Sequence, residues 1–470
     1  MNRIFISAAH KSSGKTTVCI GVCAALRARG HTVQPFKKGP DYIDPLWLGL
    51  ASGRPCYNLD AYLMSGSEIC DELARRSRGA DLAVIEGNKG LYDGLDLDGS
   101  NSNAALAALT GAPVVLVIDA RGMTRGIAPL ILGYQAFDRN IRIVGVILNQ
   151  LGGSRHEAKL RAVIAHYTDV PVLGAIQHDE RMAITERHLG LIPSNEAQAA
   201  GARINDIAES IAAQVDLDRL LTLAAQAAPL PAPLPAATRA VTGPPVRIGI
   251  ARDAAFGFYY PGDIDALQAA GAELVSFDTL RSTVLPAVDG LFIGGGFPET
   301  QMDALSANHQ LRRELHVAIE AGLPVYAECG GLMYLSRGIE WNGRSAAMVG
   351  VIPADIVMHR RPVGRGYVHL RETGKSPWPR AGAAPAPLIR AHEFHYSSVE
   401  NLPPDMEFAY EVARGHGVDG RHDGIVYRNL LASYSHLRDV GAHHWAARFV
   451  DFVRRCKTGR RPRRELARSA

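Results

Sequence analysis

A nine-residue segment near the start of the chain constrains the fold more than any other feature of the sequence. The segment AHKSSGKTT, residues 9–17, follows an apolar run at residues 4–8 and precedes an Ala-rich stretch of helical period. It matches the phosphate-binding P-loop, with Ala9 in place of the usual first glycine. Because a P-loop is the turn between a buried strand and a helix, the chain is expected to begin with a strand–loop–helix unit.

The rest of the chain alternates short apolar runs with longer Ala/Leu-rich segments, which predicts an α/β fold with parallel sheets. Strands that are apolar throughout are typical of sheets covered by helices on both faces. The predicted strands of the first half lie at residues 4–8, 32–36, 82–85, 114–118 and 143–148. Those of the second half lie at residues 246–251, 274–277, 290–293 and 324–327 and predict a second, independent sheet.

A proline-rich stretch separates the two halves. Residues 222–245 contain six prolines among alanines, so this stretch cannot hold a helix beyond its start and is expected to be a stiff, extended linker. We therefore predict a P-loop domain at residues 1–221 and a second α/β domain at residues 246–456. Residues 457–470 are rich in arginine and poor in large apolar side chains, so we expect a disordered basic tail.

Composition and charge narrow the class of protein. Of 470 residues, 47% are hydrophobic and 21% charged, as in globular proteins. A formal net charge of +4 gives no reason to expect a nucleic acid or a membrane as partner. Six cysteines are too few for a disulfide framework, and we find neither a signal peptide nor an apolar stretch of spanning length. We expect a cytoplasmic protein that acts on small molecules.

The P-loop predicts that the first domain binds ATP and Mg²⁺. Backbone N–H groups would surround the β-phosphate, the Lys15 ammonium would neutralise phosphate oxygens, and the Thr16 hydroxyl would bind the metal. Glu86 ends the strand at residues 82–85, and with Thr16 and Asp41 it is a candidate magnesium ligand. The candidate nucleotide-binding residues are Lys11, Ser12, Ser13, Gly14, Lys15, Thr16 and Thr17.

Two loops that follow predicted strands supply further candidates. The segments KKGPDYIDP, residues 37–45, and GLYDG, residues 90–94, lie at the carboxyl ends of parallel strands, where open α/β sheets bind ligands. Asp93 is a candidate catalytic residue that would orient a substrate carboxylate beside the γ-phosphate. The candidate substrate-binding residues are Tyr42, Asp44 and Tyr92. A lone aspartate in a turn also fits a purely structural role.

A cysteine in the second half has the setting of a nucleophile. The segment PVYAECGGLMYL, residues 324–335, predicts a strand, a sharp turn and a helix, with Cys329 at the corner. A nucleophilic thiol needs a base, and His436 in the segment SYSHL is the candidate. His392 and His395 compete for this role, but we expect them to be structural or to face the substrate. The candidate oxyanion-hole donors are the backbone N–H groups of Gly295, Gly296 and Gly330.

In their order along the chain, these motifs resemble those of the cobyrinic acid a,c-diamide synthase family. The resemblance rests on KSSGKTT, GPDYIDP, EGNKGLYDG, GGGFPE, AECGGLMYL, HEFHYS and SYSHL, and it covers roughly residues 1–455. It implies a dethiobiotin-synthetase-like domain fused to a class I glutamine amidotransferase domain. The implied activity is the ATP-dependent, glutamine-hydrolysing amidation of the a and c acetate side chains of a tetrapyrrole, by way of acyl phosphates.

The resemblance also implies roles for single residues. Cys329 and His436 would form a catalytic dyad, because Arg438 stands where triad amidotransferases have a glutamate, two residues after the histidine. Lys11 resembles the extra lysine of deviant P-loop proteins, which often reaches a nucleotide across a dimer, and so implies a homodimer. Asn88 and Lys89 depart from the cobyrinate pattern and resemble relatives that amidate sirohydrochlorin or sirohaem, so the macrocycle stays open.

Three other functions share part of this pattern. A cobyric acid synthase-type enzyme would amidate other side chains of the macrocycle, but the spacing around Asp41 and Asp93 favours the a,c enzyme. A partition-type ATPase switch shares Lys11 but has no use for Cys329 or His436. A non-catalytic scaffold with a vestigial cysteine turn would need neither site.

Overall fold

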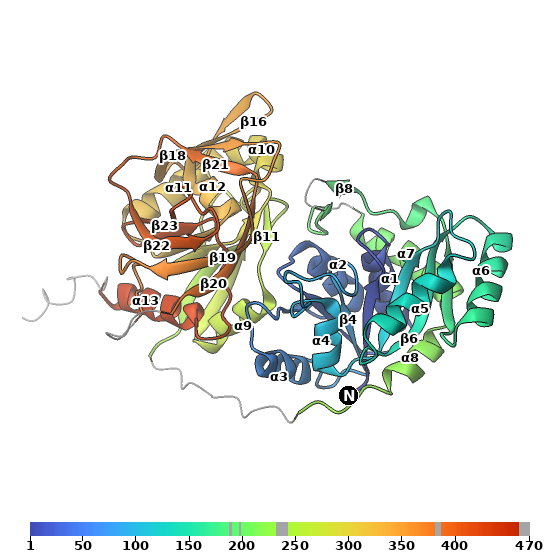
Figure 1. Ribbon diagram of the computed structural model, residues 1–470. Coiled ribbons are helices and arrows are strands. Elements are labelled where there is room, and N and C mark those ends of the chain that lie inside the picture. Colours follow the sequence, from blue (N-terminus) through green and yellow to red (C-terminus); the bar gives the residue numbers. More distant parts are fainter. Residues whose placement is uncertain (188–189, 197–198, 232–242, 381–386, 460–470) are drawn as a thin grey trace, which may run out of the picture. The chain divides into compact units, whose positions relative to one another are not determined.

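The computed structural model describes residues 1–187, 190–196, 199–231, 243–380 and 387–459. The chain divides into two compact units, Met1–Ala236 and Ala237–Ala470 (Figure 1). Each unit contains its own large sheet, so the prediction of two independent sheets is confirmed.

The first unit has a seven-stranded sheet in the order β3-β2-β4-β1-β5-β6-β7, with parallel pairing throughout. The central strands β1 and β4 are buried along their whole length, which explains their apolar sequences. Figure 1 shows helices on both sides of this sheet. Its strands are β1 (Arg3–Ala8), β2 (Val33–Lys38), β3 (Tyr57–Leu59), β4 (Leu82–Glu86), β5 (Val114–Asp119), β6 (Ile143–Leu151) and β7 (Val172–Gln177).

The helix that follows the P-loop is packed closely against its neighbours. Helices α1, α2 and α7 contact one another. A side-chain carbon at Gly21 of α1 would lie only 2.2 Å from Cγ1 of Ile211 in α7, so the absence of a side chain there allows this contact. The helices of the unit are α1 (Lys15–Ala28), α2 (Ile43–Ser52), α3 (Gly66–Arg76), α4 (Asn103–Thr110), α5 (Ile127–Phe137), α6 (Ser154–Tyr167), α7 (Ala200–Gln214) and α8 (Leu217–Ala224). Smaller elements are the 3₁₀ turn η1 (Glu180–Met182) and the strands β8 (Glu186–Arg187) and β9 (Gly190–Leu191).

The second unit has a nine-stranded sheet in the order β12-β10-β13-β15-β24-β23-β22-β19-β20. Pairing is parallel from β12 to β24 and antiparallel beyond β24. The strands are β10 (Val246–Ala251), β12 (Ala272–Phe277), β13 (Gly290–Ile293), β15 (Val325–Glu328), β19 (Gly364–Glu372), β20 (Ile389–His395), β22 (Glu407–Arg414), β23 (His422–Tyr427) and β24 (Leu430–Ser433). The sequence predicts β10, β12, β13 and β15, whose apolar runs stand out, but it does not predict the antiparallel strands.

A smaller sheet in the order β17-β16-β18-β21 and a two-stranded pairing of β11 with β14 complete the second unit. These strands are β11 (Phe256–Phe258), β14 (Gly295–Gly296), β16 (Ser336–Trp341), β17 (Arg344–Ala347), β18 (Ile352–Met358) and β21 (Ser397–Glu400). The helices are α9 (Pro261–Ala269), η2 (Pro298–Gln301), α10 (Met302–Ala307), α11 (His309–Glu320), α12 (Gly330–Leu335) and α13 (Trp445–Gly459).

The first residues of the predicted linker, residues 222–245, are helical, which its proline pattern allows. Helix α8 extends to Ala224, because Leu220 and Ala224 are buried in the first unit. Beyond the helix, the backbone N–H of Ala228 still donates to the Gly111 carbonyl at 3.1 Å. Residues 232–242 of the predicted linker lie outside the described residues.

The predicted start of the tail, residue 457, lies within helix α13 in the structure. Helix α13 continues to Gly459, and the Lys457 ammonium donates to Asp289 at 2.8 Å. Lys457 therefore belongs to the second unit, because its side chain has a carboxylate partner there. Residues 460–470 of the predicted tail lie outside the described residues.

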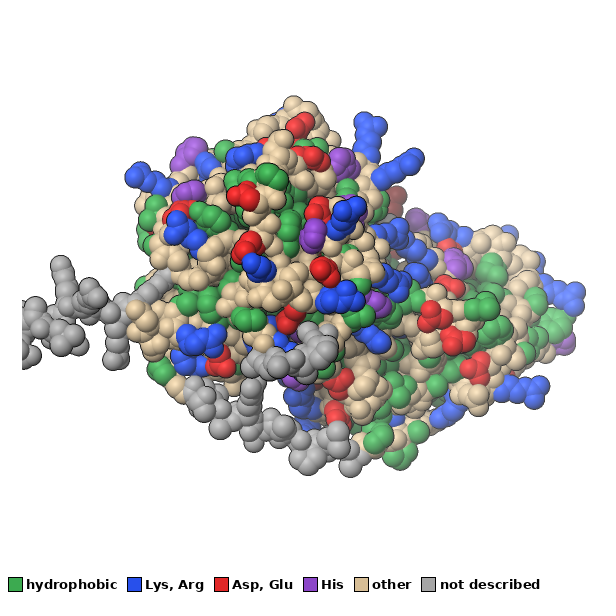
Figure 2. All heavy atoms as spheres, turned by 60° about the vertical axis from the view of Figure 1, so that its left-hand side comes forward, with side chains coloured by type: hydrophobic (Ala, Val, Ile, Leu, Met, Phe, Trp, Pro, Cys, Tyr) green, Lys and Arg blue, Asp and Glu red, His purple; other side chains and the backbone are tan. Residues whose placement is uncertain are grey.

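Helix length and surface charge bear on whether a membrane or a nucleic acid is a partner. Within the described ranges, no helix is both long and apolar enough to cross a membrane. Figure 2 shows basic and acidic side chains interspersed over the visible face. This mixture is what the small net charge of +4 leads one to expect.

Candidate active sites

The P-loop connects β1 to α1 at the carboxyl edge of the parallel sheet. Ser12 and Gly14 have φ values of 65° and 83°, in the left-handed region that tight turns use. Asn149 of β6 donates to the Ser13 carbonyl at 2.9 Å, and a side-chain carbon at Gly14 would lie 2.2 Å from its Nδ2 atom. Asn149, which the sequence analysis did not single out, therefore helps to fix the loop in the shape that a phosphate requires.

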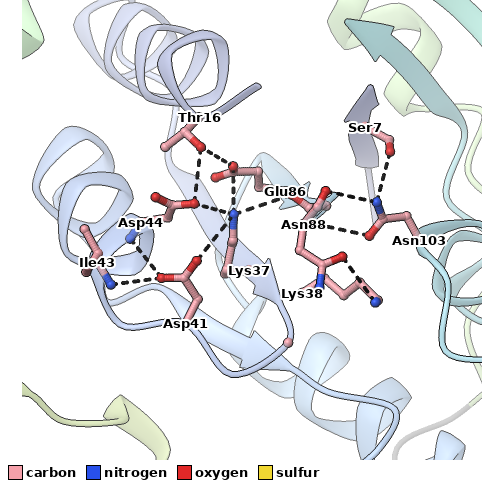
Figure 3. Close-up of polar contacts among 12 residues, drawn as sticks. Ser7, Thr16, Lys37, Lys38, Asp41, Ile43, Asp44, Glu86, Asn88 and Asn103 are labelled. Atoms are coloured by element: carbon pink, nitrogen blue, oxygen red, sulfur yellow. Dashed lines mark hydrogen bonds and ion pairs between the residues drawn. The ribbon is translucent and has the colours of Figure 1, made fainter. Parts of the chain in front are cut away.

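Carboxylates gather around one ammonium group behind the P-loop (Figure 3). Nζ of Lys37, in β2, lies 2.5 Å from Asp44, 2.8 Å from Glu86 and 3.8 Å from Asp41. The Thr16 hydroxyl lies 2.6 Å from a Glu86 oxygen and 3.2 Å from an Asp44 oxygen. The structure thus brings together the predicted metal ligands Thr16, Asp41 and Glu86, and it adds Lys37 and Asp44. We call these five residues the carboxylate cluster.

Burial and proximity shift the pKa values in the carboxylate cluster. Burial raises the pKa of Glu86, and it raises that of Asp41 to about 7, with Asp44 adding to the effect. Burial opposes ionisation of Asp44 as well, but the Lys37 ammonium holds the pKa of Asp44 below its usual range. For Lys37, burial alone would lower the pKa, yet Asp44, Glu86 and Asp41 raise it well above its ordinary value. Lys37 is therefore charged and balances its carboxylate neighbours.

The carboxylate cluster offers the oxygen donors that a divalent cation such as Mg²⁺ prefers. Oε2 of Glu86 is buried without a hydrogen-bond partner among the described residues, which leaves its lone pairs available. In the described part of the chain, no three His, Cys, Asp or Glu side chains form a metal cage. Mg²⁺ usually takes one or two carboxylates and completes its shell with water and phosphate oxygens. The residues therefore fit a cation that binds together with a nucleotide.

Replacing Lys37 by methionine is expected to destabilise the first unit. The change removes the buried ammonium from Asp41, Asp44 and Glu86, and breaking a buried ion pair in this way costs about 3–5 kcal/mol. Chemical denaturation monitored by circular dichroism measures the loss as a lower midpoint.

The neighbouring Lys38 provides a matched control. It is also buried, but its ammonium donates to the Asn101 backbone carbonyl at 2.5 Å and to neutral side-chain oxygens. Lys38→Met should therefore cost less than Lys37→Met. Equal losses in the two variants would contradict the role of Lys37 as a counter-charge.

The loop after β4 lies against the P-loop. Asp93 accepts a hydrogen bond from the Gly90 backbone at 2.9 Å. A side-chain carbon at Gly90 would lie 2.7 Å from the carbonyl oxygen of Ala9 and 2.8 Å from Oδ2 of Asp93. Asp93 is thus next to the phosphate-binding loop, where a residue that orients a carboxylate toward a γ-phosphate would need to be.

The three predicted substrate-binding residues lie in different surroundings. Asp44 belongs to the carboxylate cluster, beside the predicted metal ligands. The Tyr92 hydroxyl donates to the Tyr134 carbonyl of α5 at 2.6 Å, so this group is directed toward a helix. Tyr42 is buried at the N-terminus of α2.

In the second unit, Cys329 occupies the turn between β15 and α12. Its φ of 48° and ψ of −103° are uncommon for a residue with a side chain, as in a nucleophile elbow. Its backbone N–H donates to the Ser433 carbonyl of β24 at 2.7 Å. A side-chain carbon at Gly331 would lie 2.2 Å from the Ile293 carbonyl oxygen, so a glycine is required for α12 to start this close to β13. The strand, turn and helix around Cys329 are those that the sequence predicts.

The imidazole of His436 hydrogen-bonds to the Cys329 thiol, and both side chains are buried. The His436 backbone N–H donates to the His392 carbonyl at 2.8 Å. The His392 ring stacks on that of His436 with 4.9 Å between centroids, and burial lowers the pKa of His392 well below its ordinary value. His395 stacks instead on Tyr434 at 3.7 Å. Both competing histidines thus have packing partners, and the structure places His436 at the thiol.

A carboxylate that the sequence analysis did not predict also contacts His436. Oε2 of Glu328 lies 3.2 Å from Nδ1 of His436. Arg438, in the usual place of the acid, lies with its guanidinium 4.6 Å from the centre of the Tyr260 ring. The family resemblance implied a dyad of Cys329 and His436 without an acid, because Arg438 stands two residues after the histidine. The available signal was a glutamate at the end of a buried strand, directly before Cys329.

Three glycines border the Cys329–His436 pair. A side-chain carbon at Gly295 would lie 2.7 Å from Cε1 of His436. One at Gly330 would lie 3.0 Å from the backbone nitrogen of Gly296. Gly295 thus lies beside the His436 ring, and Gly296 lies beside Gly330, which follows Cys329 directly, so the three predicted oxyanion-hole residues come together near this pair.

Both units match known families. Residues 4–191 match the CobQ/CobB/MinD/ParA nucleotide binding domain, and residues 247–439 match the CobB/CobQ-like glutamine amidotransferase domain. A cobyrinate a,c-diamide synthase of Magnetococcus marinus is 48% identical over 96% of this chain and 97% of that protein. Another, of Methanosarcina acetivorans, is 41% identical over 98% of this chain and 97% of that protein. The chain belongs to the cobyrinate a,c-diamide synthase family.

Membership in the cobyrinate a,c-diamide synthase family confirms the resemblance inferred from the motifs. The chain is a glutamine-dependent amidating ligase with a nucleotide-binding domain followed by a glutamine amidotransferase domain. The family's two-domain order matches the order of the two units. A partition-type switch or a scaffold would not explain an amidotransferase domain in the second unit.

Proposed function

We propose that this chain amidates the a and c acetate carboxylates of cobyrinic acid, using glutamine as nitrogen donor and ATP as energy source. The observation that carries the proposal is the presence of two chemically different sites in one chain, a P-loop with its carboxylate cluster and a Cys329–His436 pair. The relatives of nearly equal length, named cobyrinate a,c-diamide synthases, support the acceptor.

The second unit would release ammonia from glutamine. The Cys329 sulfur attacks the carbon of the side-chain amide, and His436 donates a proton to the departing nitrogen. Backbone N–H groups of Gly295, Gly296 and Gly330 would stabilise the oxyanion. Water then hydrolyses the thioester and frees glutamate.

The first unit would activate the acceptor. A carboxylate oxygen attacks the γ-phosphorus of ATP and ADP leaves, which gives an acyl phosphate. Ammonia attacks the acyl carbon, phosphate leaves, and loss of a proton gives the amide. Lys15 would stabilise charge on the transferring phosphoryl group, and Asp93 would orient the acceptor. Bound at Thr16, Asp41 and Glu86, Mg²⁺ supplies charge neutralisation of the phosphates.

The acyl phosphate can be tested with an isotope. If the acceptor carboxylates carry heavy oxygen, each amidation should move one heavy oxygen into inorganic phosphate, which mass spectrometry detects. The other heavy oxygen stays in the carbonyl group of the amide. If the oxygen that leaves appeared in water and not in phosphate, phosphoryl transfer to the carboxylate would be ruled out.

The macrocycle is tested by offering separate acceptors with ATP and glutamine. Cobyrinic acid should gain two amides, whereas sirohydrochlorin and sirohaem should be recovered unchanged. The sirohydrochlorin and sirohaem acceptors were suggested by Asn88 and Lys89, whose surroundings do not require such an acceptor. Asn88 lies 3.3 Å from Nζ of Lys38, and Lys89 is exposed. Amidation of sirohydrochlorin alone, or of other cobyrinate side chains, would overturn the proposed acceptor.

The proposed enzyme is a cytoplasmic homodimer. Lys11 is exposed on the P-loop, so its side chain is available to a nucleotide on a second copy. The six cysteines are free thiols, as a reducing compartment would keep them. Light scattering of the purified protein with and without ATP measures its mass, and a monomer under both conditions would contradict the dimer.

A further inference from the structure

Glu328 holds several hydrogen-bond donors at the end of β15. Its Oε2 atom lies 3.2 Å from Nδ1 of His436. Its Oε1 atom accepts from the Tyr326 hydroxyl and, at 3.0 Å, from the backbone N–H of Leu437. The side chain is almost completely buried, so these contacts are shielded from water. Glu328 is thus bound both to the His436 ring and to the backbone beside it.

The topology of the sheet explains why these groups meet. Strands β15 and β24 pair in parallel, with Glu328 opposite Ser433. The chain that leaves β24 therefore carries His436 past the end of β15. Tyr326 and Glu328 are two residues apart on one strand, so their side chains lie on the same face. Because Cys329 follows Glu328 directly, the turn presents the thiol and the carboxylate to the same imidazole.

Arg438 cannot take the place of this carboxylate. Its guanidinium lies 4.6 Å from the centre of the Tyr260 ring, and its positive charge would repel an imidazolium. The nearby Asp263 is buried, and Arg438 only partly offsets the rise in the pKa of Asp263 that burial causes. Among the described residues, Glu328 is the carboxylate that hydrogen-bonds to the His436 ring.

We propose that Glu328 is a positioning residue for glutamine hydrolysis, which holds His436 with a proton on Nδ1 and with Nε2 directed at the Cys329 thiol. This inference rests on the proposed function of the second unit. A carboxylate at Nδ1 fixes the tautomer and the ring orientation, and it stabilises the imidazolium that forms when the thiol gives up its proton. The acid thus precedes the nucleophile in sequence, whereas the resemblance implied a dyad in which Arg438 replaces the glutamate of triad amidotransferases.

The electrostatics of His436 agree with this geometry. Burial alone would lower the pKa of His436, but the hydrogen bonds to Cys329 and Glu328 raise it to about 10. Removing the carboxylate should lower this pKa, so His436 would lose its proton at a lower pH. The groups in contact with the ring are Cys329, Glu328 and His392. Around them lie Tyr260, which hydrogen-bonds to His392, Arg438, which acts on His392, and Asp263, which acts on Glu328.

Glu328→Gln is the direct test, with glutaminase activity of the full chain as the readout. It keeps the shape of the side chain but removes its charge. We expect kcat to fall by about 10- to 100-fold, as for loss of a charge-assisted hydrogen bond, with KM for glutamine little changed. We also expect the alkaline limb of the kcat profile to move to lower pH. Glu328→Asp should recover part of the lost kcat.

Tyr326→Phe is the matched control. It removes a donor from Oε1 of Glu328 and leaves the contact between Oε2 and His436 in place. It should keep the wild-type pH profile.

The outcomes are distinguishable. If the wild type hydrolyses glutamine and Glu328→Gln matches it in kcat and pH profile, this inference is wrong and the proposed function stands. If Glu328→Gln loses activity only in proportion to its folded fraction, with an unchanged pH profile, Glu328 is structural and the inference is also wrong. If the wild type does not hydrolyse glutamine, the proposed function itself fails.

Discussion

Cys329→Ala is expected to remove glutamine-supported amidation while ammonia-supported amidation continues. The variant lacks the sulfur that attacks the glutamine amide, and loss of a covalent nucleophile lowers turnover by at least about a thousandfold. Ammonia added to the medium bypasses this step, because the acceptor is activated in the other unit. Amide formation on cobyrinic acid, measured with each nitrogen source in turn, gives the two rates.

Cys456→Ala is the control for this experiment. Cys456 is another thiol of the same unit, in α13, and its sulfur lies 3.8 Å from Nδ2 of Asn429. Its replacement should leave both rates near wild type. If Cys329→Ala kept glutamine-supported turnover, the thiol would not be the nucleophile. If it lost both activities equally while folded, the separation of the two reactions would be wrong.

Lys15→Ala is expected to remove amidation with either nitrogen source. Lys15 opens α1 at the P-loop and is buried, and burial, followed by the neighbouring Lys37, lowers the pKa of its ammonium. Removing a charge that stabilises the transferring phosphoryl group should lower the rate by at least about a hundredfold. The same assay with glutamine and with ammonia measures the effect.

Lys159→Ala, on the exposed surface of α6, is the matched control and should behave as wild type. The Cys329→Ala and Lys15→Ala variants should therefore differ most clearly when ammonia is the donor, where only the first is active. Substantial ammonia-supported activity in folded Lys15→Ala would contradict the assignment of phosphoryl transfer to the P-loop.

The parts of the molecule that depend on neighbouring residues could be predicted from the sequence. The P-loop and the turn at Cys329 each occupy one short segment, and their glycines and flanking apolar strands are visible in the chain. The strands of the parallel sheets are apolar along their length, so they also stand out.

The parts that depend on pairing between distant segments could not be predicted in the same way. Glu328 meets His436 because β15 lies beside β24, and Lys37 meets Glu86 because β2 lies beside β4. Neither strand pairing can be inferred from the residues that are adjacent in the sequence. The antiparallel strands β19 and β22 mix buried and exposed residues without regular alternation and contain charges, so neither an apolar run nor a strand period marks them in the sequence.

The ends of helices α8 and α13 also depend on contacts with residues that are distant in the sequence. Proline content indicates where a helix is unfavourable, but the end of α8 is decided by the burial of Leu220 and Ala224 in the first unit. The basic composition after residue 456 suggested a tail, yet an ion pair with Asp289 keeps Lys457 in α13.

The most direct test follows nitrogen from donor to acceptor in one reaction. The full chain is incubated with ATP, cobyrinic acid and glutamine that carries heavy nitrogen in its side-chain amide, and the product is weighed and fragmented. We predict one heavy nitrogen in each of two new amides, at the a and c side chains, with ADP and glutamate formed alongside. Unchanged cobyrinic acid in the presence of active glutamine hydrolysis and ATP would contradict it.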